Sequence, residues 1–251
     1  MRIDLNCDLG EGAGHDAELM PLITSANIAC GAHAGDEATM RATVELALRH
    51  GVAIGAHPGF ADREHFGRRE QPVTPEEVFQ LVRKQVFALQ GIARDTGAAV
   101  AHVKLHGALY NLAARDAAIA EAAAYAVRDA GPELVWFALA GSAQVAAGRE
   151  CGLTVASEVF ADRTYQADGS LTPRSRADAL IADENIAVAQ VLRMVRERKV
   201  CATDGADAAI AADTVCLHGD GAHAVEFARR LRAELAAAGV EVRSFARESR
   251  E

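Results

Sequence analysis

The sequence has no Cys-x-x-Cys pair, and the number of its cysteines is odd. The five cysteines stand far apart along the chain, at Cys7, Cys30, Cys151, Cys201 and Cys216. This pattern indicates neither a disulfide framework nor a zinc site built from thiolates. We therefore expect reduced, mostly buried thiols.

Long apolar runs and an excess of basic residues are also missing. No run could span a bilayer, and Asp4 and Asn6 stand where a signal peptide needs apolar residues. The formal net charge is -9, whereas non-specific binding of nucleic acid needs a basic face to displace counterions. We expect a cytoplasmic protein that binds neither membranes nor nucleic acid. A small anionic substrate stays open if the pocket is locally basic.

No Gly-x-x-x-x-Gly-Lys-[Ser/Thr] motif for binding ATP phosphates occurs in the sequence. The glycine-rich turn Gly10-Glu11-Gly12-Ala13-Gly14 follows a predicted strand, but it has neither the Lys nor the hydroxyl residue that such a motif uses. The turn is either a cradle for an anion or simply mobile. A triphosphate would have to be held in another way or by a partner protein.

Helical periodicity and short apolar runs alternate along the 251 residues. The best-defined helix is 75–96, because Thr74-Pro75-Glu76-Glu77 is a capping box with Pro at the first helical position. Further helices are predicted at 37–50, 116–130, 184–198 and 222–238. Strands are predicted at 3–8, 25–29, 52–56, 100–105, 134–139, 154–160 and 214–218.

Strands that alternate with helices predict a parallel sheet with right-handed crossovers. About seven such units without a Rossmann-type glycine fingerprint favour an irregular (β/α) barrel of roughly seven strands over a doubly wound sheet. One domain of residues 1–251 agrees with the usual size of such barrels. The irregular stretch 161–183 has a length typical of a lid.

Ionisable residues fall in phase on several of these strands, because side chains two residues apart point to the same side. The polar sets, strand by strand, are Asp4, Asn6 and Asp8; His102, Lys104 and His106; Glu158 and Asp162; His218 and Asp220. The opposite, apolar sides would pack against the helices. The pattern therefore predicts a polar pocket at the carboxyl ends of the strands, where barrel active sites lie.

Histidines are frequent at or near these strand ends. We expect five of them to cluster at one mouth of the barrel, namely His33, His57, His102, His106 and His218.

A single acid at a strand end has an ordinary structural explanation as well. Asp36 and Asp220 both precede predicted helices and would serve as N-caps. The row of His102, Lys104 and His106 is different, because burying three such groups is costly unless a site uses or pairs them. This row is the strongest indication of function in the residues themselves.

His33 and His57 follow the second and third strands in turns of small residues that allow a ligand to approach closely. With Asp4 or Asp8 they could bind a divalent metal. Two histidines and an acid are also a common acid–base arrangement, so both interpretations stay open.

Arg68 and Arg69 lie in a loop with Phe66. Their guanidinium groups could hold a carboxylate or phosphate by forked hydrogen bonds, and a solvated loop is the competing explanation.

Together these segments resemble the LamB/YcsF family. The matching stretches run in the family's order from residue 4 to residue 220: Asp4-Leu5-Asn6-Cys7-Asp8-Leu9-Gly10-Glu11, Ser25-Ala26-Asn27-Ile28-Ala29-Cys30-Gly31, His33-Ala34-Gly35-Asp36, Gly55-Ala56-His57-Pro58, Phe66-Gly67-Arg68-Arg69, His102-Val103-Lys104, His106-Gly107-Ala108-Leu109-Tyr110-Asn111, Glu158-Val159-Phe160-Ala161-Asp162-Arg163 and His218-Gly219-Asp220. Leu105 stands where the family usually has Pro, and Gly12-Ala13 replaces a more usual Ser-Phe pair. Neither departure removes an ionisable group.

The resemblance implies an irregular barrel of the glycoside hydrolase/deacetylase type that forms one component, A, of an ATP-dependent 5-oxoprolinase. With B and C partner subunits it would hydrolyse 5-oxoproline to glutamate, and ATP would act through the assembled complex. An unstrained lactam is a poor electrophile, so its carbonyl must be activated before a general base delivers water. A homo-oligomer and a bound divalent metal stay open.

For this reaction we expect three groups of residues. The expected catalytic residues are Asp8, His33, Lys104, His106 and Glu158. The expected substrate-binding residues are Asn6, Asn27, Arg68, Arg69, His102, Asp162, Arg163, His218 and Asp220. The metal, if bound, would be held by Asp4 and His57 with His33.

Two other functions compete with this one. A metal-dependent carbohydrate amide deacetylase would agree with the barrel type and with His33 and His57. A non-catalytic protein that only binds substrate would not need the many ionisable groups of the predicted pocket. A 5-oxoproline hydrolysis assay with ATP, with and without the partners, separates the main interpretation from both.

Overall fold

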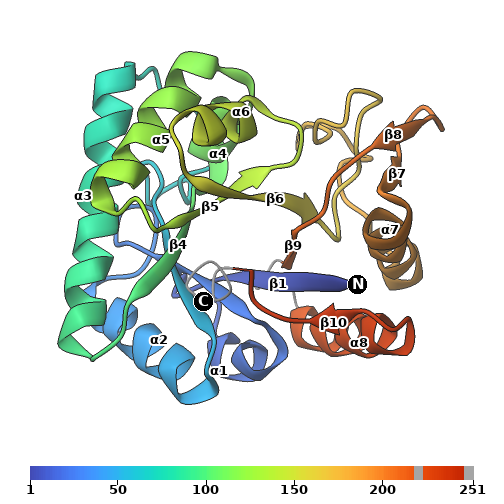
Figure 1. Cartoon of the computed structure of the whole chain (residues 1–251), viewed down its shortest axis with the longest axis horizontal. Helices are drawn as coiled ribbons and strands as arrows, with labels where there is room; N and C mark the ends of the chain where they lie inside the picture. Colours follow the sequence, from blue (N-terminus) through green and yellow to red (C-terminus); the bar gives the residue numbers. More distant parts are fainter. Residues whose placement is uncertain (218–222, 246–251) are drawn as a thin grey trace.

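The computed structural model describes residues 1–217 and 223–245. Seven parallel strands form a closed ring, because β9 pairs with β6 on one side and with β1 on the other (Figure 1). The ring strands are β1 (Arg2–Leu9), β2 (Ser25–Ala29), β3 (Ala53–His57), β4 (Val100–Lys104), β5 (Val135–Leu139), β6 (Thr154–Phe160) and β9 (Thr214–Leu217). The expected seven-stranded (β/α) barrel is confirmed. A short strand, β10 (Glu241–Val242), pairs with the start of β1 outside the ring.

Helices surround this ring (Figure 1). Five were predicted: α2 (Glu37–His50), α3 (Pro75–Asp95), α5 (Ala117–Ala130), α7 (Glu184–Glu197) and α8 (Ala224–Ala237). The prediction missed α1 (Asp16–Leu19), the 3₁₀ helix η1 (Met20–Leu22), α4 (Gly107–Arg115), α6 (Ala143–Glu150) and the hairpin of β7 (Lys199–Cys201) and β8 (Asp207–Ala209). Among the described helices, none is both long and apolar enough to cross a membrane.

Side-chain caps fix where the best-predicted helices begin. At α3 the Thr74 hydroxyl accepts a hydrogen bond from the Glu77 N–H, and the Glu77 carboxylate accepts one from the Thr74 N–H at 2.7 Å. At α2 the Asp36 carboxylate accepts from the Thr39 N–H at 2.8 Å, so its expected N-cap role is confirmed. Asp220, the other expected cap, lies outside the described residues.

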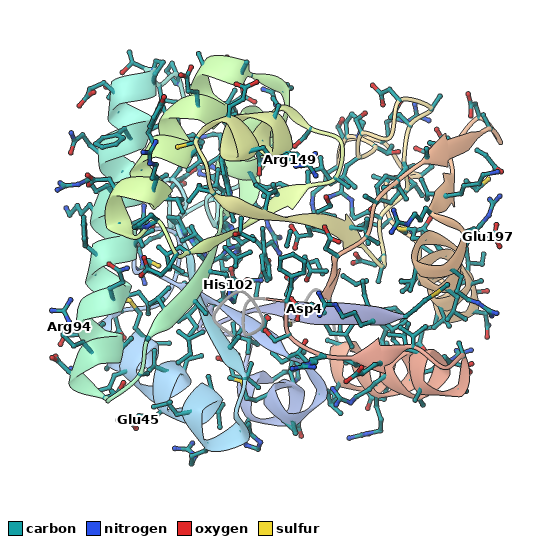
Figure 2. The ribbon with its side chains drawn as sticks, in the orientation of Figure 1. Asp4, Glu45, Arg94, His102, Arg149 and Glu197 are labelled. Atoms are coloured by element: carbon teal, nitrogen blue, oxygen red, sulfur yellow. The ribbon has the colours of Figure 1, made fainter. Side chains whose placement is uncertain are left out.

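The two sides of the ring strands differ in polarity as expected. Ile3, Leu5 and Cys7 of β1 are buried in the apolar layer between strands and helices. Asp4 and Asn6 are also buried, but among polar groups inside the ring. In Figure 2, Asp4 and His102 lie toward the middle of the barrel, whereas the labelled side chains of Glu45, Arg94, Arg149 and Glu197 extend from the outer helices. The inward side of the strands is therefore polar.

The segment between β6 and α7 contains no helix, as the sequence predicted for 161–183. Its shape is fixed by single bridges that join Arg163 to Leu180 and Tyr165 to Leu171. The buried Tyr165 hydroxyl oxygen also accepts a hydrogen bond from the Phe160 N–H at 2.7 Å. The segment is thus an ordered loop that starts at the carboxyl end of a ring strand.

Candidate active site

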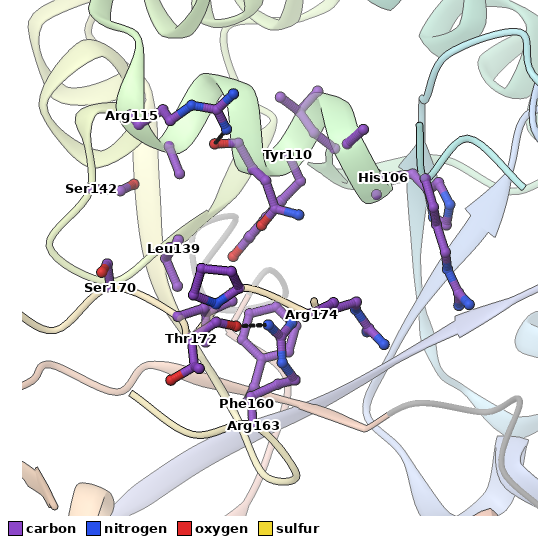
Figure 3. A pocket seen from close by; sticks show the side chains of 18 of the residues that line it. His106, Tyr110, Arg115, Leu139, Ser142, Phe160, Arg163, Ser170, Thr172 and Arg174 are labelled. Atoms are coloured by element: carbon purple, nitrogen blue, oxygen red, sulfur yellow. Dashed lines mark hydrogen bonds between the residues drawn. The ribbon is translucent and has the colours of Figure 1, made fainter. Parts of the chain in front are cut away.

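A cavity of about 940 Å³ opens at the carboxyl ends of the ring strands, where the sequence placed it. Asp8, His57 and Lys104 line it from β1, β3 and β4. The start of α4 forms another wall, and residues 168–175 of the loop after β6 lie opposite it (Figure 3). The cavity is therefore a space between the barrel mouth and the loop.

The base of the cavity holds a buried ammonium group. Lys104 Nζ lies 2.9 Å from Asp8 Oδ1 and 3.0 Å from Glu158 Oε1, and its side chain is 2% exposed. It also donates to Asn6 Oδ1 at 3.3 Å. Burial disfavours its charged form, but the surrounding anions outweigh burial and raise the pKa of Lys104 well above its usual value. The lysine is therefore charged at neutral pH.

Glu158 lies behind this lysine, away from the cavity. Its carboxylate is fully buried, accepts a hydrogen bond from the Tyr110 hydroxyl at 2.7 Å and does not line the cavity. Asp8 is partly exposed and does line it. Of the two carboxylates beside Lys104, only Asp8 is placed to touch a bound molecule.

Buried amide side chains form hydrogen bonds around Asp8 and Lys104. Asn27 donates to Asn6 Oδ1 at 2.7 Å and to Asp8 Oδ1 at 2.8 Å, and Asn6 donates to the Thr214 hydroxyl at 2.7 Å. His102 Nε2 is 2.9 Å from Asn27 Oδ1, and its ring stacks on Phe137. Asn6, Asn27 and His102 are fully buried and none lines the cavity. The expectation that these three touch substrate is corrected: they hold Asp8 and Lys104 in place.

Three other histidines meet beside Asp8. His33 Nε2 is 3.0 Å from Glu11 Oε1, His106 Nδ1 is 3.3 Å from the same oxygen, and His57 Nε2 is 3.3 Å from Asp8 Oδ2. The His33 and His106 rings are stacked, with their centroids 3.7 Å apart. The predicted clustering is thus correct for His33, His57 and His106 and wrong for His102, which lies deeper in the barrel.

Tight turns bring these rings together. Phe66 has a φ of 55°, unusual for a residue with a side chain, and its carbonyl accepts a hydrogen bond from His106 Nε2 at 2.8 Å. At Gly67, with a φ of 62°, a Cβ would lie 2.9 Å from the His33 Cβ. The turn 66–67 therefore needs glycine, and it fixes the positions of two of the three rings.

Burial shifts the pKa values of the three histidines and of Glu11. Burial lowers the pKa of His33 to about 3 and that of His106 to about 2, so both rings are neutral. At Glu11, burial and the nearby Asp8 carboxylate raise the pKa to about 7. Burial also opposes the charged form of His57, but the Asp8 carboxylate outweighs it and raises the pKa of His57.

Asp4 does not join this group. It lies toward the amino end of β1, where its carboxylate accepts hydrogen bonds from the hydroxyls of Thr24 and Ser25. The expected metal set of Asp4, His57 and His33 is therefore corrected, because Glu11 and not Asp4 supplies the carboxylate beside the two imidazoles. Four residues along an extended strand separate Asp4 from Asp8 by about 13 Å.

The predicted cationic residues are divided between the cavity and the surface. Arg68 and Arg163 line the cavity, and Arg115 and Arg174 do so as well. Arg163 also donates to the Thr172 carbonyl oxygen at 2.7 Å, which ties the start of the loop after β6 to its cavity-lining part (Figure 3). Arg69 is exposed, 3.6 Å from an Asp62 oxygen, and neither Arg69 nor Asp162 lines the cavity.

His218 and Asp220 lie outside the described residues, so the structure says nothing of their predicted roles. Besides Arg115 and Arg174, the residues of the site that were not predicted include Glu11 and Tyr110. Glu11 was assigned to a mobile or anion-binding turn, although it follows Asp8 by three residues. Tyr110 lies in α4, whose helix was not predicted, and its hydroxyl binds Glu158.

A sequence model of the LamB/YcsF family matches residues 3–250. The chain is 57% identical over 252 residues to the A component of the 5-oxoprolinase of Geobacillus kaustophilus, with 99% of this chain and 98% of the relative covered. It is 55% identical over 247 residues to the corresponding 5-oxoprolinase component of Bordetella pertussis, which covers 96% of this chain and 98% of the relative.

Two solved structures are similar to this chain to different degrees. The lactam utilization protein from Thermus thermophilus superimposes with a TM-score of 0.91 at 46% identity, over 98% of this chain and all 100% of that one. A family 4 carbohydrate esterase from Streptomyces lividans gives a TM-score of 0.51 at 10% identity, over 96% of this chain and 91% of that one. The second likeness is one of fold alone.

Proposed function

Because the chain belongs to the LamB/YcsF family, we propose that it is the A component of a 5-oxoprolinase and hydrolyses the lactam of 5-oxoproline to glutamate. The observation that carries this proposal is the Lys104 ammonium held between Asp8 and Glu158 at the base of the cavity. This array combines a fixed positive charge with a carboxylate that faces the cavity. Such a pair suits an attack of water on an amide carbonyl.

The reaction needs charge stabilisation on one atom and proton transfers on two others. Water adds to the lactam carbonyl carbon, the ring C–N bond breaks, and the nitrogen leaves as an amine after taking up a proton. Negative charge develops on the carbonyl oxygen during the attack. Lys104 would stabilise that charge, and Asp8 would take the proton from water, because Asp8 is the carboxylate on the cavity wall.

The other expected catalytic residues take supporting roles in this scheme. Glu158 does not line the cavity, so it would position Lys104 and Tyr110. His33 is 1% exposed and lies behind Glu11, whereas His106 lines the cavity. We therefore assign proton transfer at the cavity wall to Asp8, with His106 as the nearest neutral imidazole.

Recognition of the substrate carboxylate would come from the arginines on the cavity wall. Arg68 and Arg174 lie on the wall formed by loops, and Arg163 lies near the start of the loop after β6. Forked N–H groups match a carboxylate in two-point contact. A lactam with its carboxylate toward these arginines would turn its ring toward Lys104.

We further propose that ATP coupling requires the B and C partners. An unstrained lactam needs activation, and a phosphorylated carbonyl oxygen would supply it. The chain carries no P-loop sequence, and the turn Gly10–Gly14 that could have replaced it places Glu11, an acid, against the cavity. All five cysteines are free, four of them buried, which agrees with a cytoplasmic location.

The test is an assay of glutamate formation from 5-oxoproline and ATP by the assembled complex. Asp8→Asn should lower the turnover rate by about a hundredfold or more, as expected for removal of a general base. Arg83→Ala is the matched control, because Arg83 pairs with Asp129 on the outer surface, between α3 and α5. Turnover by the Asp8 variant close to that of the control would contradict the role given to Asp8.

One observation favours a second function, the metal-dependent deacetylase. Three imidazoles and a carboxylate converge beside the cavity, and such a set suits metal-assisted amide hydrolysis. The purified chain, supplied with Zn²⁺ but without ATP, should then release acetate from an N-acetylated chito-oligosaccharide. If no acetate is released under these conditions and glutamate forms with ATP, the deacetylase function is excluded and the 5-oxoprolinase function is supported.

A further inference from the structure

Four side chains from separate parts of the chain converge beside the cavity, and three of them line it. One ligand atom from each of Glu11, His33, His57 and His106 lies within 4.8 Å of the other three. We propose that these four residues bind one divalent metal ion. Three imidazole nitrogens and one carboxylate oxygen form a donor set that suits Zn²⁺ best.

Two ring nitrogens of this group, His57 Nε2 and His106 Nδ1, face each other at 2.9 Å. The other nitrogen of each ring binds a backbone carbonyl oxygen: His57 Nδ1 is 2.8 Å from that of Lys104, and His106 Nε2 is 2.8 Å from that of Phe66. A carbonyl only accepts hydrogen bonds, so His57 Nδ1 and His106 Nε2 each carry a proton. The two facing nitrogens are therefore held together by one cation, which is either a proton or a metal ion.

The same hydrogen bonds orient the rings as metal-binding histidines are oriented. Such histidines usually donate their second N–H to a backbone carbonyl or a carboxylate, which fixes the ring and its tautomer. Here both carbonyls come from residues next to the site, at the end of β4 and in the turn 66–67. The remaining nitrogens, His57 Nε2 and His106 Nδ1, are thereby held close to each other and to Glu11 Oε1.

Glu11 supplies the negative charge that such an ion needs. Its Oε1 is 3.0 Å from His33 Nε2, 3.3 Å from His106 Nδ1 and 3.9 Å from His57 Nε2. Ligands about 2.1 Å from a common ion lie at most about 4.2 Å apart, so these three spacings fit one ion once the stacked rings of His33 and His106 turn their nitrogens toward it. The carboxylate is thus a shared neighbour of all three rings.

The position of these four residues would allow a bound ion to take part in a reaction in the cavity. Glu11, His57 and His106 line the cavity, and Asp8 connects the group to Lys104 through contacts with His57 and with the ammonium. An ion here would be within reach of an oxygen of a molecule bound in the cavity. The metal site does not depend on the reaction proposed above, since it follows from the geometry of the four side chains.

Metal binding is measured on the purified chain without a histidine tag, after removal of metals with a chelator. Titration with Zn²⁺ by calorimetry, and with Co²⁺ by visible absorption, should give one equivalent bound. His57→Gln and His106→Gln should each weaken binding by at least about a hundredfold, more than the loss of an outer partner of a ligand typically costs. His50→Gln is the control, because His50 is exposed at the end of α2, and it should bind as the unchanged chain does.

Circular dichroism shows whether each variant is folded, and Glu11→Gln gives a third variant of nearly unchanged size. Absence of stoichiometric binding by the unchanged chain would overturn the proposal, and so would unchanged affinity in all three variants. A proton is the alternative cation. NMR of ¹⁵N-labelled imidazoles in the presence of Zn²⁺ would overturn the proposal if His57 carried protons on both nitrogens.

Discussion

Lys104 compensates the negative charges of two carboxylates inside the barrel. Without the lysine, these charges would destabilise the folded protein. Two carboxylates, from Asp8 and Glu158, lie within 3.0 Å of its ammonium group, and Glu158 is fully buried. Removing one partner of a buried ionic group leaves the remaining charge uncompensated, which typically costs about 3–5 kcal/mol. We therefore expect the lysine to matter for the stability of the barrel as well as for the proposed reaction.

We expect Lys104→Ala to lower the free energy of unfolding by about 3–5 kcal/mol and to abolish turnover in the assembled complex. Urea denaturation followed by circular dichroism measures the first effect. Arg83→Ala removes one partner of a surface ion pair and should cost less than about 1 kcal/mol. Equal stabilities of these two variants would show that the network around Lys104 is not coupled to folding.

Asp4 gives a prediction about pH that is separate from the active site. Burial, opposed by hydrogen bonds from Thr24 and Ser25, raises the pKa of Asp4 to about 6 from its usual 3.8. The folded state therefore binds the proton more tightly than the unfolded state, so the contribution of Asp4 to stability is fully present below pH 4 and is lost as the pH rises through 6. At pH 7 the ionised carboxylate costs about 3 kcal/mol.

Asp4→Asn should remove this contribution. The free energy of unfolding of the unchanged chain, taken relative to the variant, should fall by about 3 kcal/mol between pH 4 and pH 7. Urea denaturation at several pH values measures this difference. A difference that stays constant with pH would mean that Asp4 titrates normally in the folded protein.

Glu11 shows what strand periodicity cannot predict. Alternation along β1 correctly placed Asp8 at the mouth, but the strand ends at Leu9 and the next residues form a turn of glycines. In a turn the side-chain direction depends on backbone angles that the sequence leaves open where glycine is present. The approach of Glu11 to three imidazoles depends on those angles.

The helices that escaped prediction lack the signals that fixed the others. α3 begins at a capping box, whereas α4 begins after His106 and α6 after Ser142, and neither residue caps its helix with a side-chain hydrogen bond. Both helices are short and are stabilised by packing, so propensity and capping give little indication of them. Tyr110 was missed as a site residue for the same reason.

The loop after β6 was correctly predicted as irregular, and the structure shows what holds it. Arg163 donates to the carbonyl oxygens of Thr172 and Ala179, while Arg176 pairs with Asp178 at the surface of the same loop. Buried hydrogen bonds from a charged group contribute about 1.5–3 kcal/mol, much more than an exposed pair. Arg163 thus ties the start of the loop to its cavity-lining part and to its end.

We expect Arg163→Ala to increase the rate of proteolytic cleavage within 161–183 by about tenfold or more, because loss of about 1.4 kcal/mol of local stability raises an open population tenfold. Limited proteolysis followed by mass spectrometry locates the cleavage. Arg176→Ala is the control in the same loop and should change the rate little. Equal protection of both variants would contradict the anchoring role of Arg163.

The ring itself depends on contacts that join the two ends of the chain. Asn6 donates to the Thr214 hydroxyl across 208 residues of sequence, and β9 closes the barrel by pairing with β1. The alternation of strands and helices predicted the barrel, but the register between β1 and β9 is set by packing over the whole molecule. This register is what places Asn6, Asn27 and Asp8 around Lys104.

The lactam opening that we propose would use groups on the surface of the cavity, whereas the sequence has no P-loop for the triphosphate, so we expect the activity to belong to an assembly. The decisive measurement is glutamate formed from 5-oxoproline and ATP by the purified chain alone and by the chain with its B and C partners. We expect negligible turnover by the chain alone and ATP-dependent turnover by the complete assembly. Robust turnover by the chain alone would contradict the requirement for partners, and absence of turnover in the complete assembly would contradict the proposed function.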